Sequence, residues 1–339
     1  MRTALVEPIG IDNLSIVTRD IPEPGPGEVL VRMVWASLNY RDLLAVNGGY
    51  GRMQKQGNLV PLSDGAGEVM ALGDGVRGIK LGDKVMPAFF PNWQAGPLRP
   101  ECVTADLGGM NDGVACEYRT FRHDALVVLP NEMELRDAAT LTCAAATAWN
   151  AVVEVGQVGP GQTVLIQGTG GVSLFALQFA VAAGAKVIAT VSSDEKDALV
   201  RSMGASETVN YRTDEEWGKT VKKMTGGLGV DHVVEVGGAQ TFKQSMLAAG
   251  LAARIYMIGV VTGPRTELNI PIGAMSGTRI EGVSAGSRAS AQRMVKAIAH
   301  HRIKPVIDQQ SFTLSTVKEA ITYLEKGRHT GKIVVDLTA

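Results

Sequence analysis

Residues 162–173 read Gln-Thr-Val-Leu-Ile-Gln-Gly-Thr-Gly-Gly-Val-Ser, and this stretch decides the class of fold. The apolar run at its start predicts a buried strand, and the apolar, small-residue run over 170–183 predicts a helix. The turn between them, Gly-x-Gly-x-x-Ser from Gly168 to Ser173, matches the glycine pattern of dinucleotide-binding loops except at its last position. Gly168 permits the tight turn, and Gly170 lets the backbone approach a pyrophosphate at the helix N-terminus. We therefore predict a dinucleotide-binding loop here; the alternative is a turn with a purely structural role.

Strands and helices alternate from this turn onward, and such alternation predicts a parallel sheet with helices on both faces. The predicted strands are residues 162–167, 185–191, 230–236 and 253–258, and the predicted helices are residues 170–183, 194–203 and 240–249. The first third of the chain is β-rich instead, with predicted strands at 28–34, 67–72 and 84–87. A further helix is predicted at 289–300 and a last strand at 331–336. A chain of 339 residues with this change of pattern is expected to form two domains.

The residues after the predicted strand at 185–191 indicate which dinucleotide is bound. An NAD-preferring site usually has Asp or Glu at this strand end, but the chain has Ser192 and Ser193 there. Their hydroxyls, with Lys196 one turn into the next helix, suit a 2′-phosphate, and Tyr211 and Arg212 are placed to complete its pocket. We predict NADPH rather than NADH. A second reading, compatible with the first, makes Ser193 the N-cap of the helix.

Composition excludes several classes of function. With 33 basic and 34 acidic side chains, the net charge of −1 gives no electrostatic reason to expect nucleic acid or an anionic membrane as a partner. The most apolar stretch, residues 170–185, is shorter than the roughly 20 residues that span a bilayer. Residues 1–8 lack the apolar run of a signal peptide, and three cysteines cannot form a disulfide framework in a chain of this length. We therefore expect a cytoplasmic protein with neither a membrane nor a nucleic-acid partner.

The chain resembles the medium-chain dehydrogenase/reductase superfamily over nearly its full length. The motifs that carry this resemblance are Ala-Ser-Leu-Asn-Tyr-Arg-Asp (36–42), Asp-Gly-Ala-Gly-Glu-Val (64–69), Thr-Ala-Trp (147–149), the glycine-rich turn, Glu-Val-Gly-Gly (235–238) and Gly-Lys-Ile-Val (331–334). The resemblance implies an α/β fold: a β-rich GroES-like catalytic domain, residues 1–125 and 300–339, and a central Rossmann NADP(H)-binding domain, residues 126–299. The chain is similar to the zinc-free quinone oxidoreductases and the alcohol dehydrogenase-like proteins near them.

A comparison with zinc alcohol dehydrogenases predicts that this chain binds no metal. A catalytic zinc needs about three protein ligands of N, S or O type and an open position. Tyr40 stands at the position of the first cysteine ligand, and residues 62–64 read Leu-Ser-Asp instead of Gly-His-Glu. Of the expected ligands only Cys143 matches. Cys102 and Cys116 are too widely spaced to replace the four-cysteine lobe of those enzymes.

Without a metal, neutral hydrogen-bond donors must stabilise the negative charge that hydride transfer creates on the substrate oxygen. Asn39 can donate through its amide and Tyr50 through its phenol, and the resemblance places both in the substrate cleft. The alternatives are a turn-forming asparagine and a partly exposed loop tyrosine. Asp42 completes the predicted catalytic set as a supporting residue, because a bare carboxylate would repel the developing charge. Asp64 is expected to be a supporting residue for the same reason. Arg41 is a candidate partner for these carboxylates.

The predicted cofactor site combines three groups of residues. The first is the glycine-rich turn, the second lies at the strand ends that indicate NADPH, and the third lies along the nicotinamide, as the resemblance implies. The predicted cofactor-binding residues are Thr147, Gly168, Gly170, Gly171, Val172, Ser192, Ser193, Lys196, Tyr211, Ile258, Val260, Ser284, Ala285 and Lys332. By resemblance, Lys332 reaches the pyrophosphate or the 2′-ribose side of the cofactor.

The leading hypothesis is a zinc-independent, NADPH-dependent oxidoreductase that transfers hydride to a quinone or an α,β-unsaturated carbonyl compound. One alternative is an NAD(P)-dependent alcohol or aldehyde dehydrogenase, and another, of a different class, is a non-catalytic NADPH-binding redox sensor. The expected partners are a small-molecule substrate and a second copy of the chain. The resemblance places the homodimer contact at the edge of the Rossmann sheet, near residues 268–280, where Pro271 limits strand pairing.

Overall fold

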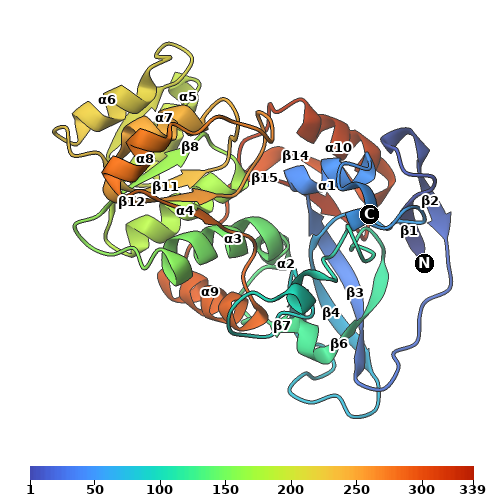
Figure 1. Ribbon diagram of the computed structural model, residues 1–339. Helices are drawn as coiled ribbons and strands as arrows, with labels where there is room; N and C mark the ends of the chain where they lie inside the picture. Colours follow the sequence, from blue (N-terminus) through green and yellow to red (C-terminus); the bar gives the residue numbers. More distant parts are fainter. The chain divides into compact units, whose positions relative to one another are not determined.

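The computed structural model describes residues 1–339, the side chain of Ile272 excepted, and the chain divides into two compact units (Figure 1). The first unit contains residues 1–146 and 285–339, and the second contains residues 147–284. The boundaries predicted from the sequence, after residues 125 and 299, both lie inside the first unit. The compact units are defined by contacts within the chain, so the predicted boundaries of the catalytic and cofactor-binding domains stay a prediction.

The second unit is built on one parallel sheet of six strands in the order β10-β9-β8-β11-β12-β13. The strands are β8 (Thr163–Gln167), β9 (Lys186–Val191), β10 (Glu207–Asn210), β11 (Val230–Glu235), β12 (Ala249–Met257) and β13 (Arg279–Gly282). The strand order reverses between β8 and β11. In doubly wound sheets the carboxyl ends of the strands at such a reversal form the ligand-binding crevice.

Helices connect these strands, as the alternation predicts. They are α4 (Gly171–Ala182), α5 (Asp194–Ser202), α6 (Trp217–Met224), α7 (Phe242–Ala248) and α8 (Ile270–Ser276). Seven of the twelve residues of α4 are buried, so this helix is the apolar element that the sequence indicated at 170–183. No helix in the described part of the chain is long and apolar enough to cross a membrane.

The predicted sheet edge near residues 268–280 is wrong in part. Most of that stretch forms α8, and Pro271 lies in the first turn of the helix, where its missing N–H costs no hydrogen bond. The edge strand is β13, which begins at Arg279. Pro271 therefore does not limit strand pairing.

The first unit is built around β3 (Glu28–Ser37), a long strand in a sheet ordered β14-β15-β3-β4-β5-β7. The other strands of this unit are β1 (Arg2–Val6), β2 (Leu14–Thr18), β4 (Asp64–Leu72), β5 (Lys84–Pro87), β6 (Tyr118–Arg122), β7 (Leu126–Val128), β14 (Ile307–Thr313) and β15 (Lys332–Asp336). Its helices are α1 (Tyr40–Val46), α2 (Leu135–Ala138), α9 (Arg288–His301) and α10 (Val317–Glu325), and α3 (Ala146–Trp149) lies at the boundary of the units. The β-rich character of the first third is confirmed.

The register around β3 positions the chemistry of this unit. Ser37, the last residue of β3, pairs with Asp64 on β4 and with Val334 on β15, both antiparallel. If the antiparallel register of β15 and β3 is continued by two residues beyond the pair Val334–Ser37, Lys332 lies opposite Asn39. Three segments distant in sequence thus meet at one end of β3.

Candidate functional site

The glycine-rich turn after β8 has the conformation that its sequence predicts. Gly168 has a positive φ of 67°, a conformation that favours glycine. Its N–H donates to the backbone oxygen of Thr190 at 2.9 Å, which fixes the turn against β9. The Ser173 hydroxyl donates to the Gln167 carbonyl oxygen at 2.6 Å and so closes the start of α4. Ser173 therefore tightens the turn where the full pattern has glycine.

Gly170 and Thr169 show that this turn fits an anionic ligand. Gly170 is the N-cap of α4 with an ordinary φ of −78°, and a Cβ added to it would meet nothing within 4 Å. Neither backbone conformation nor packing within the chain therefore requires glycine there. The Thr169 side chain is only 4% exposed, and its hydroxyl has no hydrogen-bond partner in the described structure. Open space and an unused hydroxyl beside a helix N-terminus fit the pyrophosphate of a dinucleotide.

Glu235 joins the two strands at the reversal point of the sheet. It ends β11 and is 1% exposed. Five groups donate to its carboxylate: the backbone N–H groups of Gly237 and Gly238, each at 2.9 Å, the Thr241 and Ser245 hydroxyls, and the Gln167 amide at 2.7 Å. Because Gln167 ends β8, this network fixes the turn after β11 against the end of the neighbouring strand.

The residues predicted to select NADPH lie at a common sheet edge. Asn210 of β10 pairs with Val191 of β9, so Tyr211 and Ser192 follow neighbouring strand ends, and the Tyr211 N–H donates to the Val191 oxygen at 3.1 Å. The Ser193 hydroxyl accepts from the Lys196 N–H at 3.4 Å, which makes Ser193 the N-cap of α5, the second reading. The side chains of Lys196 and Arg212 have no hydrogen bond or ion pair within the described structure. Two cations without partners are thus present beside these hydroxyls.

The remaining predicted cofactor residues lie at several places. Gly171 and Val172 form the first turn of α4, and Thr147 is buried on α3. The Ile258 N–H donates to the backbone carbonyl oxygen of Glu235 at 2.9 Å, so Ile258 lies beside the turn after β11. The other members are the exposed Val260, Ser284, whose carbonyl oxygen accepts from the Asn150 amide at 2.9 Å, and the buried Ala285. Contact of these residues with a cofactor stays a prediction.

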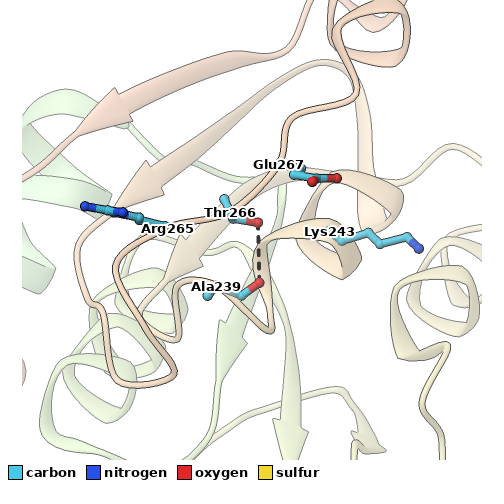
Figure 2. A pocket seen from close by; sticks show the side chains of 5 residues that line it. All are labelled: Ala239, Lys243, Arg265, Thr266 and Glu267. Carbon is cyan, nitrogen blue, oxygen red and sulfur yellow. Dashed lines mark hydrogen bonds between the residues drawn. The ribbon is translucent and has the colours of Figure 1, made fainter.

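An open pocket of about 450 Å³ lies elsewhere in the second unit and was not predicted from the sequence. Its lining residues are Ala239, Lys243, Arg265, Thr266 and Glu267 (Figure 2). The Thr266 hydroxyl donates to the Ala239 oxygen at 3.4 Å. The Lys243 and Arg265 side chains extend away from each other in Figure 2, so this pocket presents no converging set of polar groups.

In the first unit, Asn39 stands at the centre of a polar cluster. It follows the end of β3 and caps α1, with extended backbone angles. Its amide nitrogen donates to the Ser63 hydroxyl at 3.2 Å, and its amide oxygen accepts from the Lys332 ammonium. Lys332 also donates to the Asp64 carboxylate at 3.3 Å. The structure therefore places Lys332, a predicted cofactor residue, against the predicted catalytic Asn39.

Asp42, on α1, forms hydrogen bonds to two members of this cluster. Its carboxylate is buried and accepts the Asn39 N–H at 2.8 Å and the Ser63 N–H at 3.1 Å. Burial raises the pKa of the Asp42 carboxyl to about 6; the Asp64 carboxylate adds to the rise, and the Arg41 guanidinium opposes it. Asp42 thus fixes the backbone of Asn39 and of Ser63, and its supporting role in catalysis stays a prediction.

The Asp42 carboxyl predicts a measurable pH dependence of stability. Its folded-state pKa of about 6 lies above the ordinary value of 3.8, so protonation stabilises the folded protein fully below about pH 4, and this contribution is lost as the pH rises through 6. Relative to Asp42→Asn, the wild type should lose about 2 kcal/mol of unfolding free energy between pH 4 and pH 8. Denaturant titrations of both proteins across that range measure this difference. Asp12→Asn, which removes a carboxylate that is 95% exposed, is the control, and a pH-independent difference for Asp42→Asn would contradict the prediction.

Arg41 connects Tyr50 to the loop that precedes β6. Its guanidinium lies 5.6 Å from the ring centre of Tyr50 and 4.8 Å from that of Phe89. It also donates to the Leu107 oxygen at 2.6 Å and forms an ion pair with Asp106. Burial raises the pKa of the Tyr50 hydroxyl, so this group stays protonated and able to donate. Of the carboxylates near Arg41, Asp106 is its main ion-pair partner, because the contact of Arg41 with the predicted partner Asp42 is longer, at 3.7 Å.

The residues at the end of β3 do not fit a zinc ion. Asn39 faces Ser63, whereas Tyr40 is the first helical residue and is 37% exposed. Burial, reinforced by the Asp64 carboxylate, raises the pKa of the Cys143 thiol to about 12 in the metal-free protein. In the described structure no three His, Cys, Asp or Glu side chains are grouped to hold a metal. An amide, a hydroxyl, a single thiol and a lysine-paired carboxylate fall short of the three N, S or O ligands that a catalytic zinc needs.

Comparison with known proteins identifies the family. The alcohol dehydrogenase GroES-like domain model matches residues 25–131, and the zinc-binding dehydrogenase model matches residues 171–300. The chain is 41% identical to a zinc-type alcohol dehydrogenase-like protein of Schizosaccharomyces pombe, over 97% of this chain and 96% of the relative. The chain belongs to the medium-chain dehydrogenase/reductase superfamily. The resemblance and the GroES-like plus Rossmann fold predicted from the sequence are confirmed.

Solved structures of this superfamily match the whole chain. A putative alcohol dehydrogenase from Sinorhizobium meliloti 1021 has a TM-score of 0.91 and 34% identity, with 99% of each chain covered. A quinone oxidoreductase from Pseudomonas syringae pv. Tomato DC3000 has a TM-score of 0.82 and 27% identity, again with 99% of each chain covered. This medium-chain dehydrogenase/reductase is accordingly an oxidoreductase, of a family that binds nicotinamide cofactors.

Sequence reasoning missed two members of the Asn39 cluster and one member of the glycine turn. Ser63 was seen only as a departure from a zinc motif, Lys332 only as a cofactor residue, and Thr169 only as a spacer between glycines. The available signal for Lys332 was a charged residue directly before three apolar residues of a strand. For Ser63 and Thr169 no sequence signal distinguishes them from ordinary loop residues.

Proposed function

We propose that this protein is a zinc-independent, NADPH-dependent reductase that transfers hydride to a quinone or an α,β-unsaturated carbonyl compound. The observation that carries the proposal is the Asn39 amide, held between Lys332 and Ser63 at the end of β3. One of its two N–H bonds has no acceptor in the described structure. A fixed donor of this kind can stabilise negative charge on a substrate oxygen.

NADPH supplies the hydride when it is bound. The residues that would hold it are those of the turn from Gly168 to Val172 and the strand-end groups after β9 and β10. Asn39 and the protonated Tyr50 hydroxyl are proposed to donate to the acceptor oxygen as charge develops on it. Hydride transfer to a quinone or conjugated carbonyl gives a phenolate or enolate that such donors stabilise and that takes its proton from water, whereas ionising an alcohol at neutral pH is the step for which zinc enzymes use the metal.

The choice of NADPH rests on the charges at the β9 and β10 ends. Lys196 and Arg212 have no ion-pair partner in the described structure, and no carboxylate stands at Ser192. A carboxylate at that position would hydrogen-bond the 2′-hydroxyl of NAD, whereas hydroxyls and cations suit the 2′-phosphate of NADP.

The direct test is an acceptor assay. EDTA-treated protein is mixed with NADPH or NADH, and loss of nicotinamide absorbance is followed with a quinone, a short enal and a saturated aldehyde. We expect turnover with the quinone or the enal, retained after EDTA and faster with NADPH. Aldehyde turnover that EDTA abolishes and zinc restores would overturn the proposal, as would a preference for NADH.

The second candidate function is an alcohol or aldehyde dehydrogenase. It is favoured by the names of several relatives, including a structure titled NAD-dependent alcohol dehydrogenase with 31% identity and a TM-score of 0.89. Oxidation of a short alcohol in the same assay would favour it. NADPH binding without turnover of any acceptor would favour the redox-sensing alternative.

The quaternary structure and location are also part of the proposal. We expect a homodimer that pairs at β13, the edge strand of the parallel sheet, and a cytoplasmic protein with its three cysteines reduced. Analytical ultracentrifugation tests the dimer, since a monomer at micromolar concentration would contradict it.

Replacing Gly170 by alanine separates cofactor binding from folding. A Cβ there meets nothing in the chain, so we expect a stability change of at most about 1 kcal/mol, from helix capping. It would stand where the pyrophosphate approaches, so the Kd for NADPH should rise about tenfold or more. Fluorescence titration measures the Kd. Gly159→Ala, at another open glycine with an ordinary φ, should leave the Kd unchanged, and an unchanged Kd for Gly170→Ala would contradict the predicted loop.

A further inference from the structure

Lys332 is a buried lysine whose hydrogen bonds all lie inside the first unit. It is 3% exposed, and its ammonium donates to the Leu38 oxygen at 2.6 Å, to the Asn39 amide oxygen and to Asp64 at 3.3 Å. An ammonium has three N–H bonds, so these acceptors use all of its donors. The described arrangement leaves Lys332 no donor for a cofactor.

The surrounding hydrogen bonds allow one orientation of the Asn39 amide. Lys332 has no acceptor, so the amide oxygen must face it. The Ser63 hydroxyl donates its proton to Asp64 at 3.0 Å, so it can only accept from Asn39, and the amide nitrogen must face Ser63. Both neighbours therefore impose the same orientation, and the second amide proton is left over.

The charge of Lys332 also strengthens Asn39 as a donor. A cation bound to the amide oxygen draws electron density from the nitrogen, and chains of hydrogen bonds polarise one another in this way. The carboxylate of Asp64 balances the charge of Lys332, so the cluster carries a buried ion pair. Buried pairs contribute little net stability, and orientation of a neighbouring group is one role that accounts for such a pair.

We propose that Lys332 is a positioning residue that orients and polarises the Asn39 amide toward the substrate oxygen. This inference rests on the proposed function and deepens it. It differs from the role that the sequence comparison implied for Lys332, contact with the cofactor pyrophosphate or ribose. The two roles predict different consequences of removing the ammonium.

The test compares Lys332→Met with the double variant Asp64→Asn, Lys332→Met, which leaves no unpaired buried charge if the single variant does not fold. We expect kcat with the quinone or enal to fall about tenfold or more, with acceptor KM and NADPH Kd within about twofold of the wild type. In an Asn39→Ala background, removing Lys332 should cause no further loss. The control is Lys84→Met, which removes a lysine that binds the Asn131 and Met133 oxygens elsewhere in this unit and should change neither constant.

A second readout does not depend on any acceptor. The side-chain amide resonances of Asn39, assigned by their loss in Asn39→Ala, should shift when Lys332 is replaced and stay unchanged in Lys84→Met. A weaker NADPH Kd with unchanged kcat would overturn the inference in favour of the cofactor role. Independent losses from Asn39 and Lys332, or unshifted amide resonances, would also overturn it. Absence of turnover in the wild type with every acceptor would instead overturn the proposed function, and the amide resonances would still decide whether Lys332 orients Asn39.

Discussion

Replacing Asn39 by alanine is expected to lower kcat with a quinone or enal about 10²–10³-fold, the usual effect of removing one oxyanion donor. The NADPH Kd should stay within about twofold, because no predicted dinucleotide contact involves the amide. Stopped-flow measurement of nicotinamide oxidation at saturating NADPH gives the hydride-transfer rate, and fluorescence titration gives the Kd.

Asn47→Ala is the matched control for this prediction. Asn47 ends the same helix, α1, and its side chain accepts from the Ile11 N–H at 3.3 Å at an exposed position. Its loss should leave hydride transfer within about twofold of the wild type. If Asn39→Ala were equally mild, the amide would be a capping group of α1 and not an oxyanion donor. That outcome would remove the main support for the proposed chemistry.

Replacing Glu235 by alanine is expected to reduce the free energy of unfolding by about 3–5 kcal/mol. The carboxylate accepts five hydrogen bonds in a buried position, and its loss leaves the Gly238 N–H without an acceptor and the Gly237 N–H with only its 3.3 Å bond to the Gln167 amide oxygen. Each buried donor without an acceptor costs about 1–3 kcal/mol, and water entering the space recovers part of the sum. Chemical denaturation followed by tryptophan fluorescence measures the change.

Asp231→Ala provides the comparison on the same strand. The Asp231 carboxylate accepts one backbone hydrogen bond, from Thr163 at 2.7 Å, at an exposed position. Its loss should cost no more than about 1 kcal/mol. A Glu235→Ala variant as stable as Asp231→Ala would show that the turn after β11 is held by other contacts, and that Glu235 does not join the two central strands.

The sequence was sufficient for the Rossmann unit because its signals are local. Strands such as β8 and β9 are short runs of apolar residues, and the glycines between β8 and α4 identify the turn without any distant contact. Even there, the stretch from 268 to 280 was misjudged, because a proline that disfavours a strand suits equally well the first turn of α8.

The Asn39 cluster could be predicted only in part. Asn39, Tyr50 and Asp42 were selected by residue type, but their partners come from β4 and β15, and pairing between distant strands leaves little trace in a single sequence. The turn into α1 also decides that Asn39 faces Ser63 while Tyr40 is partly exposed, and spacing in the sequence does not predict this. The segment before the parallel sheet contains two π-helical stretches, Leu141–Ala145 and Asn150–Val155, which residue spacing does not predict.

The first unit is built from two segments, residues 1–146 and 285–339, and this affects the order of folding during synthesis on the ribosome. Lys332 is made 268 residues after its partner Asp64, whereas residues 147–284 are complete before β14 and β15 exist. Until β15 emerges, a nascent chain would have to bury Asp64 without a counter-charge, which disfavours closure of the sheet around it. The second unit is therefore expected to fold first during translation, and the Asn39 cluster to form only after β15 has left the exit tunnel.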